Sequence, residues 1–579
     1  MKGTTPKGDE DDIKKYVHDS SLDFKGRVPL RHSTGSWKAS FFIIAIEFSE
    51  RLSYFGIATN LITYMTKVMQ QDLKTAANSV NIWSGVTAVM PLVGGFLADS
   101  YTGGFTMILL SAILYVLGLT LLTMSQYIPT LKPCTKCDHP NKSHEVVFYL
   151  AIYLVSVATG GYKPCLQSFG ADQFDDDNAK ERKQKMSFFN WWNVSLCCGI
   201  FFGDTLIVYM QDNVAWGIGF LILALTMGVS VLVFIIGRPF YRFRPSKGSP
   251  FVPLFKVFVA AFAKRSLSSP SDSSLLYEGS VSSDKRLLSH TDRLRFFDKA
   301  AIIEDNDPIN NGAIRKNEQI NPWRLASVTQ VEELKLIINM VPIWLTCLVF
   351  GIGISQGTTF FIKQGSVMNR RISKHFEIPA ASLFIMTAIG MMVTVCVYDK
   401  VLLPYLRRST GNERGISILT RMGIGMVILI IATIVSALVE NKRLTSELNG
   451  TTLSAFWLAP QFLLIGMGDG FSLVGMQEYF YEQVPDSMRS LGLAFYLSVI
   501  GVGSFMSTFL IMIVDSFSGK NGGKKWIGKD LNSSRLDYFY WFLTVIFAVN
   551  MCFYVYLSRN YKYKKVQRKV DNGDSCEDI

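Results

Sequence analysis

The feature that most constrains this sequence is a series of apolar runs, each long enough to cross a lipid bilayer. A spanning helix needs roughly 20 mostly apolar residues to cross about 30 Å of hydrocarbon. Such runs recur near 38–66, 75–98, 105–127, 146–169, 187–211 and 214–237, and again near 331–356, 377–403, 413–440, 453–481, 489–516 and 534–558. The sequence therefore predicts an all-α membrane protein with about twelve transmembrane helices.

A long polar segment separates the two series of runs, so we expect two six-helix bundles. The predicted regions are a cytosolic N-terminal tail at 1–37, a first bundle at 38–237, a cytosolic central loop at 238–330, a second bundle at 331–558 and a cytosolic C-terminal tail at 559–579. No cleavable signal peptide is expected, because the start is polar and carries the acidic cluster 9–12.

The central loop combines a disordered and an aromatic part. Its Ser-rich tract at 266–274 cannot bury a core and is predicted to be disordered; a kinase acting on this loop is a candidate partner. The basic, aromatic stretch at 251–262 has two interpretations of equal weight, a helix lying at the lipid interface and a solvated linker.

The distribution of charge indicates orientation and excludes a nucleic-acid partner. The chain has a formal net charge of +12, but its basic residues lie mostly between spans, where the positive-inside rule accounts for them with both termini in the cytosol. Two predicted external loops, 363–374 and 520–529, run against this bias. The glycosylation sequons at Asn141, Asn449 and Asn532 all fall on the predicted external side.

The nine cysteines do not predict a metal site. Most lie in apolar runs, where Cys behaves as a small hydrophobe. Cys134 and Cys137 lie in a polar loop near His139 and His144. A zinc site there would lack a second ligand pair, so a local disulfide or two free thiols is favoured. No metal and no cofactor are predicted.

The first run contains three charged residues that share one helical face, Glu47, Glu50 and Arg51, with Tyr54 on the same face. A carboxylate at the centre of a span costs roughly 2.5–3.5 kcal/mol on insertion scales. Two acids beside one Arg leave one acid incompletely neutralised, as a reversible proton carrier requires. The alternative is a static ion pair between helices, which has no use for the second acid.

Two further ionisable residues lie deep in later runs. Lys163, in the fourth run, needs an acid, and we expect Glu47 or Glu50 to supply it. Asp469, in the tenth run, lies between glycines that permit close helix approach. Glu478 is nine residues further and on the opposite face. Glu478, Glu482 and Arg489 fall toward the predicted cytosolic end of the helices, which suits a gate or an interfacial ion pair and not a solute site.

These motifs together resemble the proton-dependent oligopeptide transporter family, and specifically its plant nitrate/peptide branch. Glu47-Phe-Ser-Glu50-Arg51 matches the family's E-x-x-E-R motif, the segment 161–175 resembles its signature after the fourth span, and Phe188-Phe-Asn-Trp-Trp-Asn193 resembles its fifth-span signature. The resemblance implies a major facilitator fold with alternating access driven by protons. The implied solute-binding residues are Arg51, Tyr54, Lys163, Asn193, Gln356 and Asp469.

Departures from the family pattern concern the substrate. The basic residue that often follows the second span is replaced by the stretch 102–104, and Tyr54-Phe55 stands where peptide-transporting members tend to have two tyrosines. A His that binds nitrate in a plant member would fall at Ile354, so the simplest nitrate site is absent.

Three functional classes remain to be compared. The favoured one is a proton-coupled symporter of a small anionic or zwitterionic solute, such as nitrate, a peptide, a hormone or a secondary metabolite, in the plasma or vacuolar membrane. A sensor of the same fold without net transport is the alternative, although a sensor would be expected to lose its proton-handling acids. An enzyme is disfavoured, because the sequence does not contain the H-E-x-x-H motif of zinc metalloproteases.

Overall fold

A computed structural model of the chain describes residues 15–17, 21–133, 142–175, 178–244, 251–267, 276–277, 288, 290–303, 323–373, 376–410, 415–484, 489–518, 525–528, 530–561 and 563. The first half contains α2 (Ser36–Ala58), α3 (Leu61–Lys67), α4 (Leu73–Leu97), η1 (Ala98–Thr102), α5 (Gly104–Tyr127), α6 (Lys142–Ala171), α7 (Ala179–Phe202), η2 (Gly203–Ile207), α8 (Val208–Asn213), α9 (Trp216–Ile236) and η3 (Arg238–Phe240). Of these, η1 and η2 are π-helical turns.

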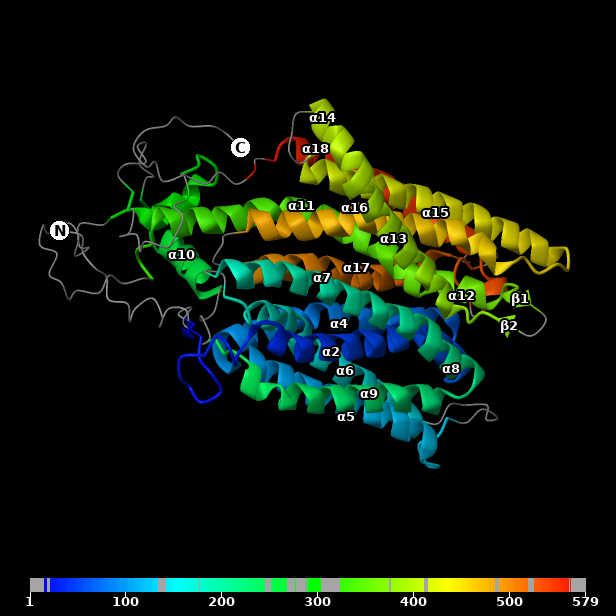
Figure 1. Cartoon of the computed structure of the whole chain (residues 1–579). Coiled ribbons are helices and arrows are strands. Elements are labelled where there is room, and N and C mark those ends of the chain that lie inside the picture. Colours follow the sequence, from blue (N-terminus) through cyan, green and yellow to red (C-terminus); the bar gives the residue numbers. More distant parts are fainter. Residues whose placement is uncertain are drawn as a thin grey trace, which may run out of the picture. The chain divides into compact units, whose positions relative to one another are not determined.

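The rest of the chain is also almost entirely helical (Figure 1). It contains α10 (Phe251–Ala263), η5 (Arg295–Ala301), α11 (Val328–Thr358), α12 (Phe360–Ser366), η6 (Ala381–Phe384), α13 (Ile385–Val397), η7 (Tyr398–Leu402), α14 (Leu403–Thr410), α15 (Ile418–Leu448), η8 (Ala455–Leu458), α16 (Ala459–Gln483), α17 (Arg489–Phe517), η10 (Leu531–Ser533) and α18 (Leu536–Arg559). A two-stranded antiparallel sheet of β1 (Arg371–Ser373) and β2 (Phe376–Glu377) pairs Arg371 with Glu377.

The prediction of an all-α protein with about twelve spans is confirmed. Among the described residues, 11 helical segments are long and apolar enough to cross a membrane. The first predicted span, α2, adds one more crossing, although its three charges Glu47, Glu50 and Arg51 take it past the charge limit that defines the others. Each predicted run therefore corresponds to a helix or to a chain of consecutive helical segments.

Two helices extend well beyond their apolar runs. α7 begins at Ala179 because the Asn178 side chain accepts hydrogen bonds from the backbone N–H groups of Lys180 and Glu181, which caps the helix. α15 continues to Leu448, and its polar last turns are held by the Glu440–Arg443 pair. Hydropathy marks the part of a helix that meets lipid, whereas capping and ion pairs decide where the helix ends.

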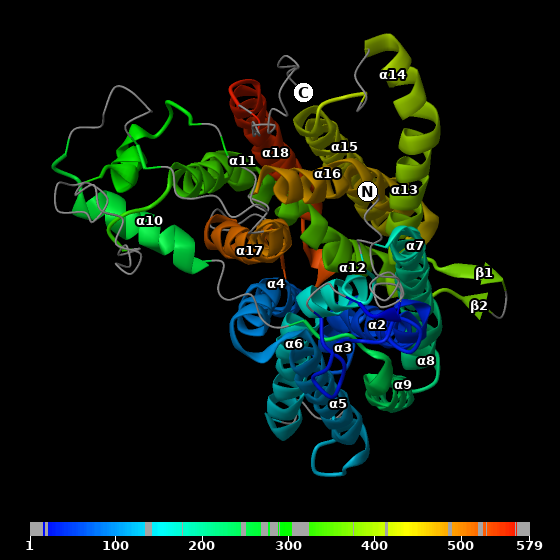
Figure 2. The same ribbon diagram turned by 60° about the vertical axis from the view of Figure 1, so that its left-hand side comes forward.

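The described residues form two compact units. The larger comprises 1–248, 346–476 and 494–555, and the smaller comprises 249–345, 477–493 and 556–579. Within the larger unit, α2, α4, α5, α6, α7 and α9 form one packed group, visible in both ribbon views as the blue to green helices (Figures 1 and 2).

Close packing of α4 against α6 depends on missing side chains. A Cβ atom on Gly94 would collide with the backbone of Gly160 and Gly161, and one on Gly161 would collide with the side chains of Ser111 and Met107. These glycines therefore allow α4 and α6 to approach backbone to backbone, and allow side chains of α5 to pack directly on the α6 backbone. The approach places the following turn of α6, which carries Lys163, against α2 and α4.

The two halves of the larger unit meet through polar contacts. The ammonium of Lys74 on α4 lies 2.7 Å from a carboxylate oxygen of Asp515 on α17. Asn81 on α4 donates to the hydroxyl of Ser507 on α17 at 3.2 Å. Lys363 on α12 donates to the hydroxyl of Thr66 on α3 at 3.0 Å. The Lys74–Asp515 contact lies near the helix ends that the orientation prediction places outside, and the Asn81–Ser507 contact lies about two turns further along α4.

The segment before α2 is fixed to the first half by two arginines, of which Arg242 is buried and Arg31 is partly exposed. Arg242 is fully buried and lies 2.7 Å from Glu181, and Arg31 lies 3.0 Å from Glu181 and 2.7 Å from Asp175. Burial of an unpaired charge is costly, so each arginine here has a carboxylate partner. A Cβ on Gly35, whose φ is +70°, would collide with the Arg242 guanidinium, so the segment passes directly over this cation.

The smaller unit has a hydrophobic core of its own. Val257, Ala260 and Ala261 of α10 pack with Phe297, Ala300 and Ala301 of η5 and with the first turns of α11. The opposite face of α10 exposes Phe255, Phe258 and Phe262. The stretch 251–262 is thus a helix with one packed and one exposed aromatic face. The predicted disordered tract at 266–274 lies almost wholly outside the described residues.

A charged cluster closes this core and has the geometry of a cation site. His290, Asp298 and Glu332 each present a ligand atom, all within 4.8 Å of one another. The ammonium of Lys335 already lies 2.6 Å from Asp298 and 2.8 Å from Glu332. Lys335 thus supplies a positive charge to both buried carboxylates and occupies the place between them that a metal ion would need.

Candidate functional site

The predicted acid pair and arginine on α2 form one buried cluster. The Arg51 Nε atom lies 2.8 Å from Glu47 and 3.2 Å from Glu50. The side chains of Glu47 and Glu50 are 2% and 0% exposed. Helical periodicity puts these three residues on one face, and the neighbouring helices α6 and α7 cover that face. One guanidinium therefore stands against two buried carboxylates.

The two carboxylates are not equivalent. Glu47 accepts a hydrogen bond from Arg51 Nε at 2.8 Å, whereas within the described part of the chain neither oxygen of Glu50 has a hydrogen-bond partner. Glu50 is near Arg51 without receiving a well-directed hydrogen bond from it. An ionised carboxylate in a low-dielectric interior is stable only with counter-charge and donors. The geometry therefore suits a cluster in which one acid is ionised and paired while the second exchanges a proton.

Lys163 reaches this cluster, but not through the expected ion pair. Its ammonium lies 4.3 Å from the centroid of the Tyr54 ring. Among the described residues, no carboxylate lies within 4.0 Å of Lys163. Tyr54 in turn stacks on Trp83 of α4, with ring centroids 5.8 Å apart and an interplanar angle of 19°. The indole N–H of Trp83 donates to the carbonyl of Ile152 at 3.0 Å. This hydrogen bond fixes the position of Trp83, on which Tyr54 stacks.

Two buried tyrosines complete the surroundings of the α2 cluster and were not predicted. Tyr115 on α5 and Tyr162 on α6 are both fully buried, and neither hydroxyl has a hydrogen-bond partner. Both lie within electrostatic range of Glu50. The position of Tyr162 directly before Lys163 is a sequence signal for it. Tyr115 lies in an uninterrupted apolar run. Its position near the α2 cluster becomes visible only through the packing of α5 on α6.

Asp469 in the second half is buried among closely packed helices. Its side chain is 7% exposed, and its Oδ1 atom has no hydrogen-bond partner. A Cβ on Gly466 would collide with the backbone of Thr387 on α13, so α13 and α16 touch along this stretch. Tyr496 on α17 lies within electrostatic range of the carboxyl. Among the described residues, no cation lies within 4.0 Å of Asp469.

Gln356 lies within the second half, beside the hydroxyl through which Asn81 of the first half makes contact. Its side-chain amide donates to the carbonyl of Ile352 at 2.8 Å and to the hydroxyl of Ser507 at 3.2 Å, and its Oε1 has no partner. Asn81 donates to the same hydroxyl. In the part of the chain that the structure describes, no hydrogen bond or ion pair joins Gln356 or Asp469 to the α2 cluster.

The remaining predicted residues are placed as follows. Glu478 and Glu482 lie in the last two turns of α16, and Arg489 is the first residue of α17. The side chains of Arg489 and Asn193 are outside the description. Asn141, Cys134, Cys137 and His139 fall outside the described residues. His144 is buried, with its ring nitrogens 2.8 Å from the Tyr64 hydroxyl and 2.8 Å from the carbonyl of Leu131.

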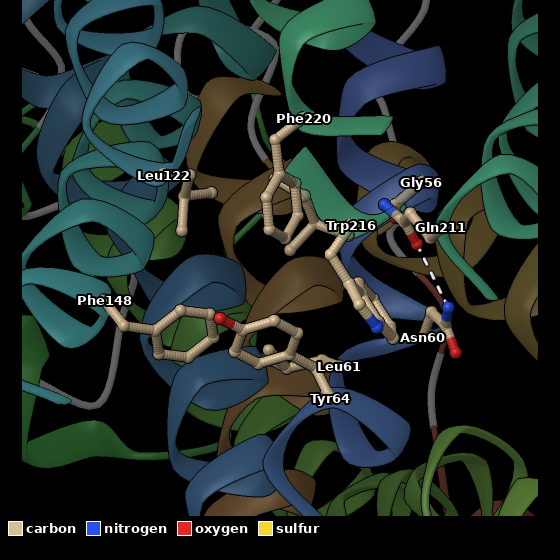
Figure 3. Close-up of a pocket in the computed structure, with 10 residues that line it drawn as sticks. Gly56, Asn60, Leu61, Tyr64, Leu122, Phe148, Gln211, Trp216 and Phe220 are labelled. Atoms are coloured by element: carbon tan, nitrogen blue, oxygen red, sulfur yellow. Dashed lines mark hydrogen bonds between the residues drawn. The ribbon is translucent and has the colours of Figure 1, made fainter. Parts of the chain in front are cut away.

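A small cavity lies in the first half, away from these residues (Figure 3). Its volume is about 10 Å³, room for roughly one water molecule. Asn60 donates to Gln211 at 3.1 Å beside it, while the carbonyl oxygen of the Asn60 side chain has no partner. The lining residues are Gly56, Ile57, Asn60, Leu61, Tyr64, Leu122, Phe148, Gln211, Trp216 and Phe220. This cavity suits a buried water and is too small for a solute.

Comparison with known proteins identifies the family. The family model described as "PTR2: POT family" matches residues 105–527. The chain belongs to the POT family. It is 56% identical over 561 residues to "Protein NRT1/ PTR FAMILY 5.6" of Arabidopsis thaliana, covering 96% of each chain, and 53% identical over 588 residues to "Protein NRT1/ PTR FAMILY 5.7", covering 99% of this chain and 97% of the relative.

Solved structures of POT family transporters share the fold. "Crystal structure of auto inhibited POT family peptide transporter" superposes with a TM-score of 0.67 at 18% identity, over 93% of this chain and 99% of the other. "In meso crystal structure of the POT family transporter PepTSo" gives a TM-score of 0.64 at 17% identity, over 90% and 98%. This POT family member is therefore a multi-pass membrane transporter with the major facilitator arrangement.

Proposed function

We propose that the protein is a proton-coupled symporter that moves a small anionic or zwitterionic solute by alternating access. The observation that carries this proposal is the inequality of the two acids on α2. Glu47 is hydrogen-bonded to Arg51, whereas Glu50 is fully buried beside the same guanidinium without a hydrogen bond. A purely structural ion pair needs one acid, and the second gives the cluster a group that can bind and release a proton.

The charges near the cluster support the solute class. Lys163 has an aromatic ring beneath its ammonium and no carboxylate within 4.0 Å among the described residues. Its positive charge is thus available to a carboxylate or another anion on the solute. Asp469 offers an unpartnered carboxylate oxygen in the second half, which suits a solute amine. A zwitterion would use both groups, and a simple anion would use Lys163.

The proposal is tested by uptake into proteoliposomes with and without an inward proton gradient, using a screen of nitrate, dipeptides and carboxylated hormones. Glu47→Gln and Glu50→Gln are each expected to abolish accumulation against a gradient while retaining part of the counterflow exchange, which moves no net proton. Glu447→Gln, an exposed acid on α15, is the matched control. Normal accumulation by both α2 variants would show that the cluster does not couple protons to the solute.

A further inference from the structure

A second buried carboxyl group, far along the chain from the α2 cluster, stands without a partner. Asp204 lies in the π-helical turn η2 and is 0% exposed. Neither of its carboxylate oxygens has a hydrogen-bond partner, and no cation lies within 4.0 Å among the described residues. An ionised carboxylate is strongly disfavoured in such a place, whereas a protonated one is tolerated. π-Helical turns inside α-helices frequently mark functional sites.

Thr59 is a polar side chain next to this carboxyl. Its hydroxyl donates to the carbonyl oxygen of Phe55 at 2.7 Å. With its proton used in that bond, the hydroxyl keeps two lone pairs that can accept. A protonated Asp204 can donate to this oxygen, whereas an ionised Asp204 would have to draw the hydroxyl proton away from Phe55.

Among the described residues, the elements packed most closely against η2 place no counter-charge beside Asp204. They are α2, α7, α8 and η6, and η6 contains no ionisable residue. On α2 the nearest charge is Arg51, which is eight residues or about 12 Å before Thr59 and is already paired with Glu47 and Glu50. On α8, Asp212 accepts a hydrogen bond from Asn60.

The titratable groups of α7 do not change this balance. Its charged residues lie in its first two turns, and nearer to η2 it carries only Cys197 and Cys198, both exposed. No basic side chain of these four elements therefore stands ready to stabilise an ionised Asp204 in the described residues.

Asp204 also lies where the two halves touch. Its backbone carbonyl accepts a hydrogen bond from the hydroxyl of Ser382 on η6 at 2.7 Å. One turn further, Tyr209 of α8 stacks on Phe376 of β2, with ring centroids 6.2 Å apart. Both contacts join the first half of the chain to the second. Separation of the halves at this end would break them and remove the cover from η2.

We propose that Asp204 is a second proton-binding site of the transporter. It takes a proton from water when the halves separate at this end, and holds the proton in a dry site when they close. The step converts a carboxylate and hydronium into a carboxylic acid and water, with no other reactant. The inference rests on the proposed proton coupling, to which it adds a site whose occupancy follows the contact between the halves.

Infrared spectroscopy of the full-length protein in liposomes tests the site without any solute. The wild-type protein at neutral pH is expected to show a C=O stretch from a protonated carboxyl in the interior. Asp204→Asn should remove one component of this band, and Asp212→Asn, which changes a neighbouring acid, should leave it intact. Identical bands in wild type and Asp204→Asn would overturn the proposal.

Thermal unfolding provides a second measurement. Asn has the shape of a neutral carboxyl, so Asp204→Asn should match the wild type in acid. As the pH rises, Asp204 ionises in the unfolded wild-type chain, which lowers the free energy of that state. In the folded protein Asp204 stays protonated, so the wild type loses stability. The Tm of the variant should therefore exceed that of the wild type increasingly at alkaline pH. A Tm difference that does not depend on pH would contradict the site.

Two further outcomes separate this inference from the proposed symport. If Asp204→Asn fails to fold, Thr59→Val carries the test: it removes the acceptor and should shift the carboxyl band, and an unshifted band would overturn the assignment. If Asp204→Asn loses the band but wild-type uptake does not depend on the proton gradient, the proton site is supported and the proposed proton coupling is refuted. If Asp204→Asn keeps the band and wild-type uptake is driven by the gradient, the Asp204 site is refuted and the proposed symport is supported.

Discussion

The ammonium group of Lys163 lies 4.3 Å from the ring centroid of Tyr54, and Tyr54 stacks on Trp83. The Lys163 ammonium is thus packed against aromatic rings of α2 and α4. Among the described residues it forms no ion pair within 4.0 Å. A cation over an aromatic face is stabilised by about 0.5–2 kcal/mol, depending on desolvation. The arrangement positions Lys163 beside the Glu47–Arg51 pair while leaving it free to bind an anion.

A double-mutant cycle distinguishes this arrangement from an ion pair. Lys163→Met and Tyr54→Leu are expected to be coupled by about 0.5–2 kcal/mol in the free energy of unfolding. Lys163→Met and Glu47→Gln should be coupled more weakly than this pair, because among the described residues no carboxylate lies within 4.0 Å of Lys163. Tyr54→Phe, which keeps the ring, is the control and should behave like the wild type. Stronger coupling of Lys163 to Glu47 than to Tyr54 would refute the aromatic contact.

The buried pair Glu440–Arg443 on α15 is expected to be a major contributor to stability. The two side chains are 0% and 2% exposed and meet through two hydrogen bonds of 2.8 and 2.9 Å. Gln364 on α12 donates to the same carboxylate at 2.6 Å. Removing one member of a buried pair leaves an uncompensated charge, which costs about 3–5 kcal/mol.

Thermal unfolding in detergent measures this effect. Arg443→Met and Glu440→Gln should each lower the Tm strongly, whereas Asn441→Ala, an exposed change on the same helix, should leave it nearly unchanged. Equal Tm values for Arg443→Met and Asn441→Ala would show that the pair contributes no net stability.

The comparison of sequence and structure shows which features depend on local pattern. The spans follow from the length of the apolar runs, and the Glu47, Glu50 and Arg51 cluster follows from spacing within one helix. Tyr115 and the aromatic partner of Lys163 could not be predicted, because they arise from contacts between helices far apart in the sequence. Asp204 could have been predicted. Like Asp469 it is an acid inside an apolar run, and an ionisable residue inside a predicted span marks a candidate functional site.

The end of α15 shows a further limit of hydropathy. The predicted run stopped at residue 440, but the helix continues to Leu448 because Glu440, Arg443 and Glu447 satisfy one another beyond the apolar part. An apolar pattern reports only the stretch in contact with lipid or core, so polar turns held by ion pairs are invisible to it.

The sequons are expected to differ in use. The amide of Asn532 donates to Glu447 at 2.6 Å, and its oxygen accepts from Arg443 at 2.7 Å. A glycan on this nitrogen would break the contact with Glu447. Asn449 is exposed at the end of α15. We therefore expect Asn449→Gln to remove a glycosidase-sensitive mobility shift, while Asn532→Gln leaves the shift intact and lowers the Tm. A shift that disappears only in Asn532→Gln would contradict this assignment.

The last prediction concerns Asp469, whose buried carboxyl has an unpartnered oxygen and no cation within 4.0 Å among the described residues. If the solute is a zwitterion, its amine is the missing partner, and Asp469→Asn should raise the KM because a charge-assisted contact is lost. The loss of a hydrogen bond to a charged group, about 1.5–3 kcal/mol, corresponds to a rise of roughly 10- to 150-fold. If the solute is a simple anion, an ionised Asp469 repels it, so the same change should leave the KM unaltered or lower it and weaken its pH dependence. The KM of the best solute, measured at two pH values in wild type and Asp469→Asn, separates the two cases. An Asp469→Asn protein with unchanged KM and unchanged pH dependence would show that this carboxyl serves helix packing and does not meet the solute.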